Sequence, residues 1–220
     1  MPGAVVFDMD GVLIDSEEVW SEVRAAVVAG HGGHWTEQDQ RNVMGDNSRQ
    51  WSAYITRTWR LTISPDAIFR EVLEMMIARY RRGIHVLPGA ARAVSEIGSV
   101  YPLAVASSSP RELIPVALQL AGFGDAFRAI VSSDEVERGK PSPDVYLLAA
   151  KRLGVDPDRC LAIEDSSNGI RAAVAAGMAT IAVPTQAYPP SQEVLALARL
   201  VLSSLEELTL DSINGLQSSE

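Results

Sequence analysis

Ala4-Val5-Val6-Phe7-Asp8-Met9-Asp10-Gly11-Val12 is the stretch of sequence that decides the fold. Its first four residues form a short apolar run of the kind found in strands buried on both faces. Asp8 and Asp10 follow, and alternate side chains of an extended chain project to the same side. Gly11 lets the backbone turn away directly afterwards. An isolated pair of acids at a strand end is more often a solvated cap than a functional site. Whether Asp8 and Asp10 are functional therefore depends on which residues follow the other strands.

The chain beyond this stretch alternates between strand and helix patterns. Apolar runs predict buried strands at residues 103–106, 129–131, 160–163 and 179–183, with a weaker run near Leu200. Helix patterns lie between them, at approximately 90–97, 111–121, 143–153 and 169–176, the last stopped by Gly177 in a left-handed cap. This alternation predicts an α/β fold, a doubly wound parallel sheet wrapped by helices on both faces.

Residues 16–87 interrupt that alternation, because they contain no comparable strand run and have a helical pattern throughout. Ser64-Pro65-Asp66, for example, predicts an N-cap and a proline in the first turn of a helix. We therefore expect a catalytic core formed by residues 1–15 and 88–220, with residues 16–87 inserted as a helical domain after the first strand. The insert holds all four tryptophans. They are expected mainly to form its core, although one or two could wall a ligand pocket.

Composition narrows the protein class. With 47% hydrophobic and 21% charged residues, the chain is typical of a soluble globular protein. Its net charge of −9 disfavours nucleic acid and anionic membranes as partners. Cys160, the single cysteine, cannot form an internal disulfide and is expected in the core of a protein from a reducing compartment. Neither a secretory signal nor a membrane-spanning stretch is evident, so we expect a cytoplasmic protein, and a monomer.

Polar residues follow the other predicted strands at their carboxyl ends. The second strand leads into Ser107-Ser108-Ser109, the third is followed by Gly139-Lys140-Pro141, and the fourth ends in Glu164-Asp165-Ser166. In a parallel sheet these ends converge on one edge, where doubly wound folds bind their ligands. Converging carboxylates at Asp8, Asp10 and Asp165 would be costly without a cation and suit Mg²⁺. The sequence therefore predicts a magnesium site beside the acid pair.

Two further residues complete a site for phosphoryl transfer. Ser107 can donate a hydrogen bond to a phosphoryl oxygen, and Lys140 can supply positive charge where negative charge spreads over the transferring group. Taken singly, Ser107 could instead cap the helix before Arg111, and Lys140 could be a solvated loop lysine. Their occurrence together, in this order, favours the catalytic interpretation.

These residues resemble the four motifs of the haloacid dehalogenase superfamily: Asp8-Met9-Asp10-Gly11-Val12, Ser107, Lys140 in Gly-Lys-Pro-Ser-Pro-Asp, and Glu164-Asp165. The helical insert resembles the first type of cap in that superfamily, so the resemblance covers essentially the whole chain. It implies that Asp8 is the nucleophile and Asp10 the general acid and base. It also implies that the Asp8 carboxylate, the Asp10 backbone carbonyl and Asp165 bind the metal, with Glu164 acting through water.

The same resemblance indicates a branch of the superfamily. Members that displace halide or cleave phosphonates typically lack an acid at the position of Asp10, so its presence indicates small phosphate esters as substrates. The sequence is similar to β-phosphoglucomutases and to sugar or hexitol phosphatases. A mutase is expected to have histidine in place of Trp20 and lysine in place of Met76. We therefore favour a sugar or sugar-alcohol phosphatase, with a phosphosugar mutase as the alternative and a catalytically silent binding module as a remote third.

Substrate recognition is expected from both parts of the chain. Ser107, Ser108 and Lys140 are the candidates in the core. In the insert, Arg49 is expected to bind phosphate when the insert closes over the site, and Trp20 to wall the pocket. His31 and His34 lie among glycines without acidic or cysteine partners nearby in the sequence, so we expect loop histidines rather than a metal site.

Overall fold

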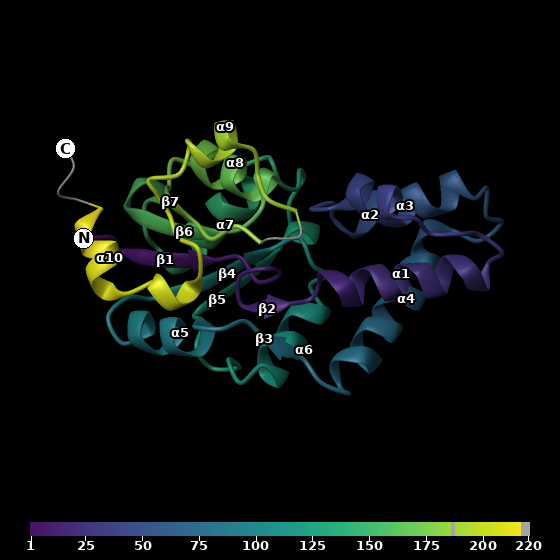
Figure 1. Ribbon diagram of the computed structural model, residues 1–220, viewed down its shortest axis with the longest axis horizontal. Coiled ribbons are helices and arrows are strands. Elements are labelled where there is room, and N and C mark those ends of the chain that lie inside the picture. Colours follow the sequence, from purple (N-terminus) through teal and green to yellow (C-terminus); the bar gives the residue numbers. More distant parts are fainter. Residues whose placement is uncertain (186–187, 217–220) are drawn as a thin grey trace.

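The computed structural model describes residues 1–185 and 188–216 (Figure 1). Its main sheet has six parallel strands in the spatial order β5-β4-β1-β6-β7-β8. The strands are β1 (Ala4–Phe7), β4 (Leu103–Ser107), β5 (Ala129–Ser132), β6 (Cys160–Glu164), β7 (Ala179–Ala182) and β8 (Leu200–Val201). Every strand predicted from the apolar runs is present, and the doubly wound parallel sheet is confirmed.

The strand order places β1 at the centre of the sheet. From β1 the chain moves outward to β4 and β5, and then crosses back to β6 on the other side of β1. The strand order therefore reverses between β1 and β6, and such a switch point leaves a crevice beyond the carboxyl ends of the strands. Asp8 follows β1 directly, and Glu164 is the last residue of β6.

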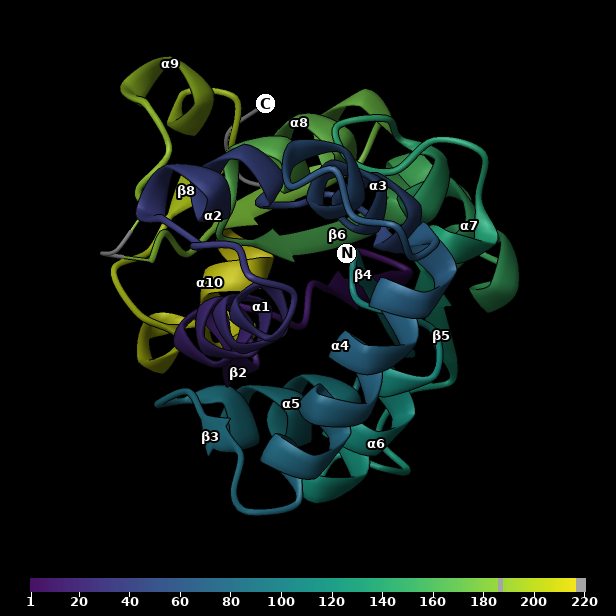
Figure 2. The same ribbon diagram turned by 90° about the vertical axis from the view of Figure 1, so that its right-hand side faces the viewer.

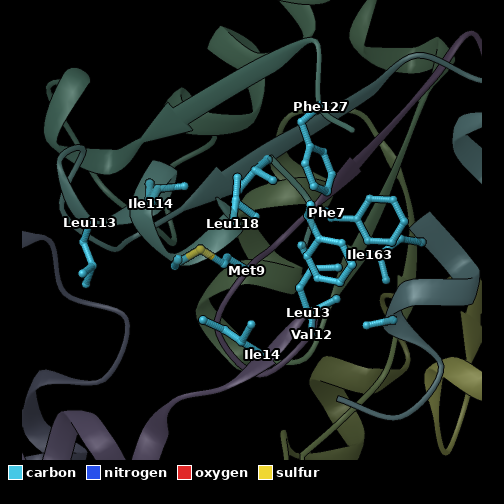
Figure 3. Packing of buried hydrophobic residues seen from close by; sticks show 14 of the residues in the cluster. Phe7, Met9, Val12, Leu13, Ile14, Leu113, Ile114, Leu118, Phe127 and Ile163 are labelled. Atoms are coloured by element: carbon cyan, nitrogen blue, oxygen red, sulfur yellow. The ribbon is translucent and has the colours of Figure 1, made fainter. Parts of the chain in front are cut away.

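Helices cover both faces of the sheet. One face packs against α7 (Asp144–Leu153) and α8 (Ser167–Ala175), and the other against α5 (Ala90–Gly98) and α6 (Leu113–Leu120). The alternation along β1 decides which residues face which layer: Val5 and Phe7 belong to the cluster that includes α5 and α6, whereas Ala4 and Val6 belong to the cluster that includes α7. Figure 3 shows Phe7 between Phe127 and Ile163 in the larger cluster. Strand β1 is thus anchored on both faces, which fixes the position of Asp8.

The insert after β1 is a bundle of four helices lying beyond the carboxyl ends of the strands (Figures 1 and 2). They are α1 (Glu17–Gly30), α2 (Glu37–Val43), α3 (Ser48–Thr58) and α4 (Pro65–Tyr80). Ser64 caps α4 and Pro65 lies in its first turn, as predicted. Trp20, Trp35 and Trp51 are buried, so tryptophans do form much of this bundle's core. His31 is the C-cap residue of α1, and its Nε2 lies 2.9 Å from Oε2 of Glu71 in α4.

A short antiparallel ribbon joins the insert to the sheet. It pairs β2 (Ile14–Asp15) with β3 (His85–Val86), through the residue pairs Ile14–Val86 and Asp15–His85. The sequence did not predict this ribbon, because strands of two residues show no periodicity. The chain therefore enters and leaves the insert at the same place, close to the predicted boundaries of the insert at residues 16 and 87.

The remaining elements are short: the 3₁₀ helices η1 (Ser133–Glu135), η2 (Pro157–Arg159) and η3 (Leu205–Glu207), with α9 (Gln192–Leu195) and α10 (Leu210–Gly215). Gly177 adopts a φ of 81° after α8, which confirms the predicted left-handed stop. Cys160 is buried at the start of β6, and burial raises the pKa of its thiol to about 11. It is therefore an unreactive core residue at neutral pH. Within the described ranges, no helix has the length and apolar character needed to cross a membrane.

Candidate active site

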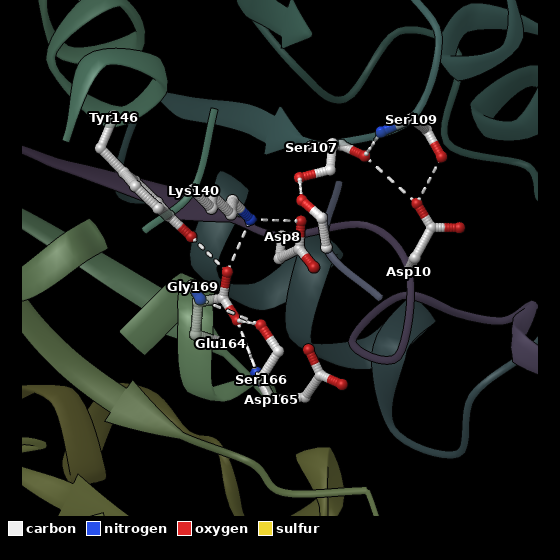
Figure 4. Close-up of polar contacts among 12 residues, drawn as sticks. Asp8, Asp10, Ser107, Ser109, Lys140, Tyr146, Glu164, Asp165, Ser166 and Gly169 are labelled. Atoms are coloured by element: carbon white, nitrogen blue, oxygen red, sulfur yellow. Dashed lines mark hydrogen bonds and ion pairs between the residues drawn. The ribbon is translucent and has the colours of Figure 1, made fainter. Parts of the chain in front are cut away.

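Lys140 connects the ends of β1 and β6. Its Nζ lies 2.8 Å from Asp8 Oδ1 and 2.6 Å from Glu164 Oε1, and all three side chains are buried (Figure 4). Two adjacent carboxylates raise the pKa of Lys140, so the ammonium stays charged at neutral pH. Burial nevertheless raises the pKa of Asp8 to about 7, against the opposing charge of Lys140. Lys140 is thus a buried counter-ion of the predicted nucleophile and not a solvated loop lysine.

Glu164 is held in place by contacts at both of its carboxylate oxygens. Oε1 accepts hydrogen bonds from Lys140 and from the Tyr146 hydroxyl at 2.8 Å. Oε2 accepts from the backbone N–H groups of Asp165 (3.0 Å) and Ser166 (3.1 Å) at the start of α8. A Cβ atom at Gly169 would lie 1.7 Å from Oε1, so only glycine leaves room for this carboxylate. These contacts suit a residue that orients Lys140. The binding of a metal by Glu164 through a water molecule stays a prediction.

Asp165 provides the clearest test of whether a cation fits. Carboxylate oxygens of Asp8, Glu164 and Asp165 lie within 4.8 Å of one another. Oδ1 of Asp165 is buried and accepts no hydrogen bond from the described residues. Burial, followed by the charges of Glu164 and Asp8, raises the pKa of Asp165 well above its usual value. A buried carboxylate oxygen without a partner is costly, and a hard divalent cation would supply that partner. The residues therefore fit a magnesium ion.

Asp10 lies beside Asp8 in a cluster of hydrogen-bond donors. Its Oδ1 accepts from the Ser16 hydroxyl at 2.5 Å and from Trp20 Nε1 at 3.4 Å. Its Oδ2 accepts from the hydroxyls of Ser107 at 3.1 Å and Ser109 at 2.7 Å (Figure 4). Ser107, predicted to contact a phosphoryl oxygen, therefore contacts Asp10 in this structure. Ser16 is the N-cap residue of α1, but its hydroxyl donates to Asp10 rather than accepting from the helix backbone.

A cavity of about 300 Å³ lies over these carboxylates, between the core and the insert. Its volume is at the lower end of the range for small-molecule sites, roughly 300–1,000 Å³. Asp8, Asp10, Lys140 and Asp165 line the core side. The predicted substrate-binding residues Ser108 and Trp20 also line it, and the Ser108 hydroxyl donates to the carbonyl oxygen of Gly45 in the insert at 3.0 Å.

The arginines that line the cavity, Arg24 and Arg41, are not the one predicted. Arg49 does not line it: in this structure its Nη2 lies 3.4 Å from the Val136 carbonyl oxygen, at an outer contact between insert and core. Arg24, which the sequence analysis did not single out, lines the cavity and is 6% exposed. One signal could have found it: Arg24 lies one helical turn after Trp20, on the buried face that also holds Val27.

Comparison with known proteins identifies the family. The family model for haloacid dehalogenase-like hydrolases matches residues 2–177, which is most of the chain. The protein therefore belongs to the haloacid dehalogenase-like hydrolase family, as the motifs predicted.

Individual relatives narrow the class within that family. The chain is 36% identical over 222 residues to hexitol phosphatase B of Escherichia coli (strain K12), with 96% of each chain covered. It is 33% identical over 213 residues to the bifunctional riboflavin kinase/FMN phosphatase of Arabidopsis thaliana, of which it spans only 55%. The crystal structure of CbbY from Rhodobacter sphaeroides in complex with phosphate superposes with a TM-score of 0.89 at 29% identity, covering 97% of this chain and 100% of that one. The enzyme is a phosphatase of this family.

Proposed function

We propose that this enzyme is a magnesium-dependent phosphatase that hydrolyses a phosphorylated sugar or sugar alcohol through a phosphorylated Asp8. The observation that carries the proposal is the meeting of Asp8, Lys140 and Asp165 at the floor of a small cavity, with Asp10 beside them. The 36% identity to a hexitol phosphatase supports the substrate class. We also propose that the insert, with the boundaries 16–87, acts as a cap over the core.

Asp8 and Asp10 divide the chemistry between them. An oxygen of Asp8 attacks the phosphorus atom, the ester P–O bond breaks, and Asp10 gives a proton to the departing alkoxide. A water molecule then loses a proton to Asp10 and attacks the phosphorus, the bond to Asp8 breaks, and inorganic phosphate leaves. Lys140 holds the Asp8 carboxylate in position throughout. Ser107 and Ser108 are proposed to turn their hydroxyls toward the phosphoryl oxygens, since a hydroxyl rotates to suit its partner.

Asp8, the Asp10 backbone carbonyl and Asp165 are the proposed magnesium ligands. When bound there, magnesium would polarise the phosphoryl group and screen its repulsion from Asp8. The crowding of Asp8, Glu164 and Asp165 supports this assignment, and so does Asp165 Oδ1, for which residues 1–185 and 188–216 supply no hydrogen-bond partner.

The mutase alternative has less support from the residues around the cavity. Trp20 lies in the wall at the position where mutases are expected to have histidine, and its indole N–H donates to Asp10. Met76, at the position of the expected lysine, is fully buried in α4 and does not line the cavity. Among the described residues that line the cavity, neither a histidine at position 20 nor a lysine at position 76 is present, the two residues by which a mutase would be recognised.

A substrate panel tests the proposed function. We expect inorganic phosphate to be released from hexitol or hexose phosphates in the presence of Mg²⁺ and not in EDTA, and riboflavin 5′-phosphate to be a poor substrate. With β-glucose 1-phosphate and a catalytic amount of the bisphosphate, phosphate release should dominate over glucose 6-phosphate accumulation. Accumulation without phosphate release would instead establish the mutase. Absence of turnover on every phosphate ester tested would favour the silent binding module.

Cap closure gives a second expected result. The first turn of α3 is fastened to the core through Asp134, whose carboxylate accepts from the Ser48 backbone N–H at 3.1 Å and from the Ser48 hydroxyl at 2.6 Å. Asp134→Ala should lower kcat/KM for the best sugar phosphate about 10-fold, because one charged contact is lost from the closed form. Small p-nitrophenyl phosphate, which needs little cap binding, should change far less. The control is Asp158→Ala, because Asp158 is an exposed aspartate of the core, and this change should leave both activities unaltered. If Asp134→Ala changed kcat/KM no more than Asp158→Ala does, Asp134 would have no role in cap closure. Arg49 lies at the same outer contact, and its binding of phosphate when the insert closes stays a prediction.

A further inference from the structure

Arg24 has an unusual environment for a buried arginine. Its guanidinium carbon lies 4.7 Å from the ring centroid of Trp20 and 5.5 Å from that of Trp51, so two indole faces hold it. Nη1 donates to the Gln40 side-chain oxygen at 3.2 Å, whereas the buried Nε has no hydrogen-bond partner among the described residues. Within the described part of the chain, no carboxylate oxygen lies within 4.0 Å of its guanidinium nitrogens, although Glu17 and Asp46 are near enough for their charges to act on its pKa. Burial lowers the pKa of Arg24 to about 10, which still leaves it charged at neutral pH.

A buried arginine without a carboxylate in direct contact is costly to maintain for stability alone. Replacing buried ion pairs with apolar side chains of similar volume is often neutral or stabilising, so burial of a charge is weak evidence that it serves stability. The aromatic contacts offset only part of the desolvation cost. Arg24 lines the cavity over Asp8, and its guanidinium retains hydrogen-bonding capacity beyond the single bond to Gln40. This combination indicates that Arg24 is retained for a ligand.

Gln40 links Arg24 to an acceptor in the same wall. The Gln40 amide, 2% exposed, receives a hydrogen bond from Arg24 and donates one to Glu17 Oε2 at 3.2 Å. Glu17, Trp20 and Arg24 all belong to α1 and all line the cavity, so one helix presents an acceptor, an aromatic face and a donor side by side. A hydroxyl group of a substrate can donate a hydrogen bond to Glu17 and accept one from Arg24.

The charges of this wall indicate what kind of group it suits. The insert contributes two bases to the cavity lining, Arg24 and Arg41, and two acids, Glu17 and Asp46. Their formal charges cancel, so a second phosphate or a carboxylate on the substrate would meet no net positive charge on this side. An uncharged chain of hydroxyl-bearing carbons, by contrast, can use the donor, the acceptors and the indole faces together.

We propose that Arg24, with Glu17 and supported by Gln40, forms a hydroxyl-recognition site that binds the uncharged polyol part of the substrate and sets specificity for it. The site rests on the proposed function, because it lies opposite the phosphate-binding floor of the same cavity. Arg24 and Glu17 touch substrate in this assignment, whereas Gln40 is a positioning residue.

The test compares Arg24→Met with wild type on three substrates: a hexitol phosphate, phosphoglycolate, whose leaving group carries a carboxylate, and p-nitrophenyl phosphate. We expect kcat/KM for the hexitol phosphate to fall about 10- to 100-fold, chiefly through KM, because a charged hydrogen bond to substrate is lost. Activity on p-nitrophenyl phosphate should stay within about 3-fold, since this ester lacks hydroxyls for the site. Arg57→Met is the matched control, because Arg57 is an exposed arginine of the same helical insert; it should change neither activity.

Thermal unfolding separates a binding role from a structural one. The melting temperature of Arg24→Met should stay close to that of wild type, because methionine keeps the packing against Trp20 and Trp51, and removal of an incompletely satisfied buried charge offsets the lost contact with Gln40. A lower melting temperature with a parallel loss on all substrates would show that Arg24 is structural and overturn the proposal. Two results would indicate recognition of charge and overturn the assignment to uncharged hydroxyls. One is full activity of Arg24→Lys. The other is a preference of the wild type for phosphoglycolate that Arg24→Met loses. If wild type hydrolyses p-nitrophenyl phosphate but no sugar or sugar-alcohol phosphate, the proposed substrate class itself fails, whatever Arg24→Met does.

Discussion

Asp8→Asn should lower kcat by about three orders of magnitude or more, because an amide cannot attack phosphorus to form an acyl phosphate. The change removes no atom from the packing around β1, and Lys140 keeps its ion pair with Glu164. The variant should therefore remain folded, with a melting temperature close to that of wild type. Steady-state phosphate release, measured beside the thermal transition, checks both expectations.

Two observations sharpen this test. Asp125→Asn, the same change at an exposed loop position, should leave kcat unaltered. Beryllium fluoride with Mg²⁺ should bind wild type as a mimic of the phosphorylated aspartate and should not bind Asp8→Asn. Turnover close to normal in a correctly folded Asp8→Asn enzyme would refute the covalent route through Asp8.

The second large effect is expected from Asp165→Asn, through the magnesium site. Loss of a carboxylate ligand should raise the half-saturating concentration of Mg²⁺ about 100-fold or more, since even outer contacts of a metal site contribute 10- to 100-fold. High Mg²⁺ should then recover part of the activity, unlike in Asp8→Asn. The measurement is a Mg²⁺ titration of initial rates. An unchanged half-saturating concentration with a reduced maximum rate would show that Asp165 has another role.

The sequence was most informative about the sheet and its carboxyl edge. Buried parallel strands must be apolar along their whole length, so β1 and β6 stood out as short runs. Parallel strands also end at a common edge, so the acids after β1 and at the end of β6 could be expected to meet. The sequence did not predict contacts that depend on the backbone. Examples are the hydrogen bonds from the backbone N–H groups of Asp165 and Ser166 to Glu164, and the space that Gly169 leaves for the Glu164 carboxylate.

The insert was harder to predict, because the role of each polar residue depends on how its helix is rotated toward the core. Arg24 and Arg49 are both helical arginines, and the spacing of Arg24 from Trp20 is a weak local signal that it faces the interior of the insert. Arg49 was predicted to bind phosphate, whereas the role of Arg24 becomes evident when Trp20, Trp51 and Gln40 are seen to surround it. Ser16 illustrates the same limit, since its contact with Asp10 outweighs its local preference for capping α1.

The ribbon of β2 and β3 has a consequence for how this architecture tolerates change. Because Ile14 pairs with Val86, the two ends of the insert are held together by backbone hydrogen bonds, and residues 16–84 replace what would otherwise be a hairpin turn. The entropy of closing a loop rises slowly with its length, by about 0.6 kcal/mol for each doubling. The sheet can therefore fold with inserts of very different size. Evolution can then replace the helices that contact the substrate without moving the carboxylates at the end of β1.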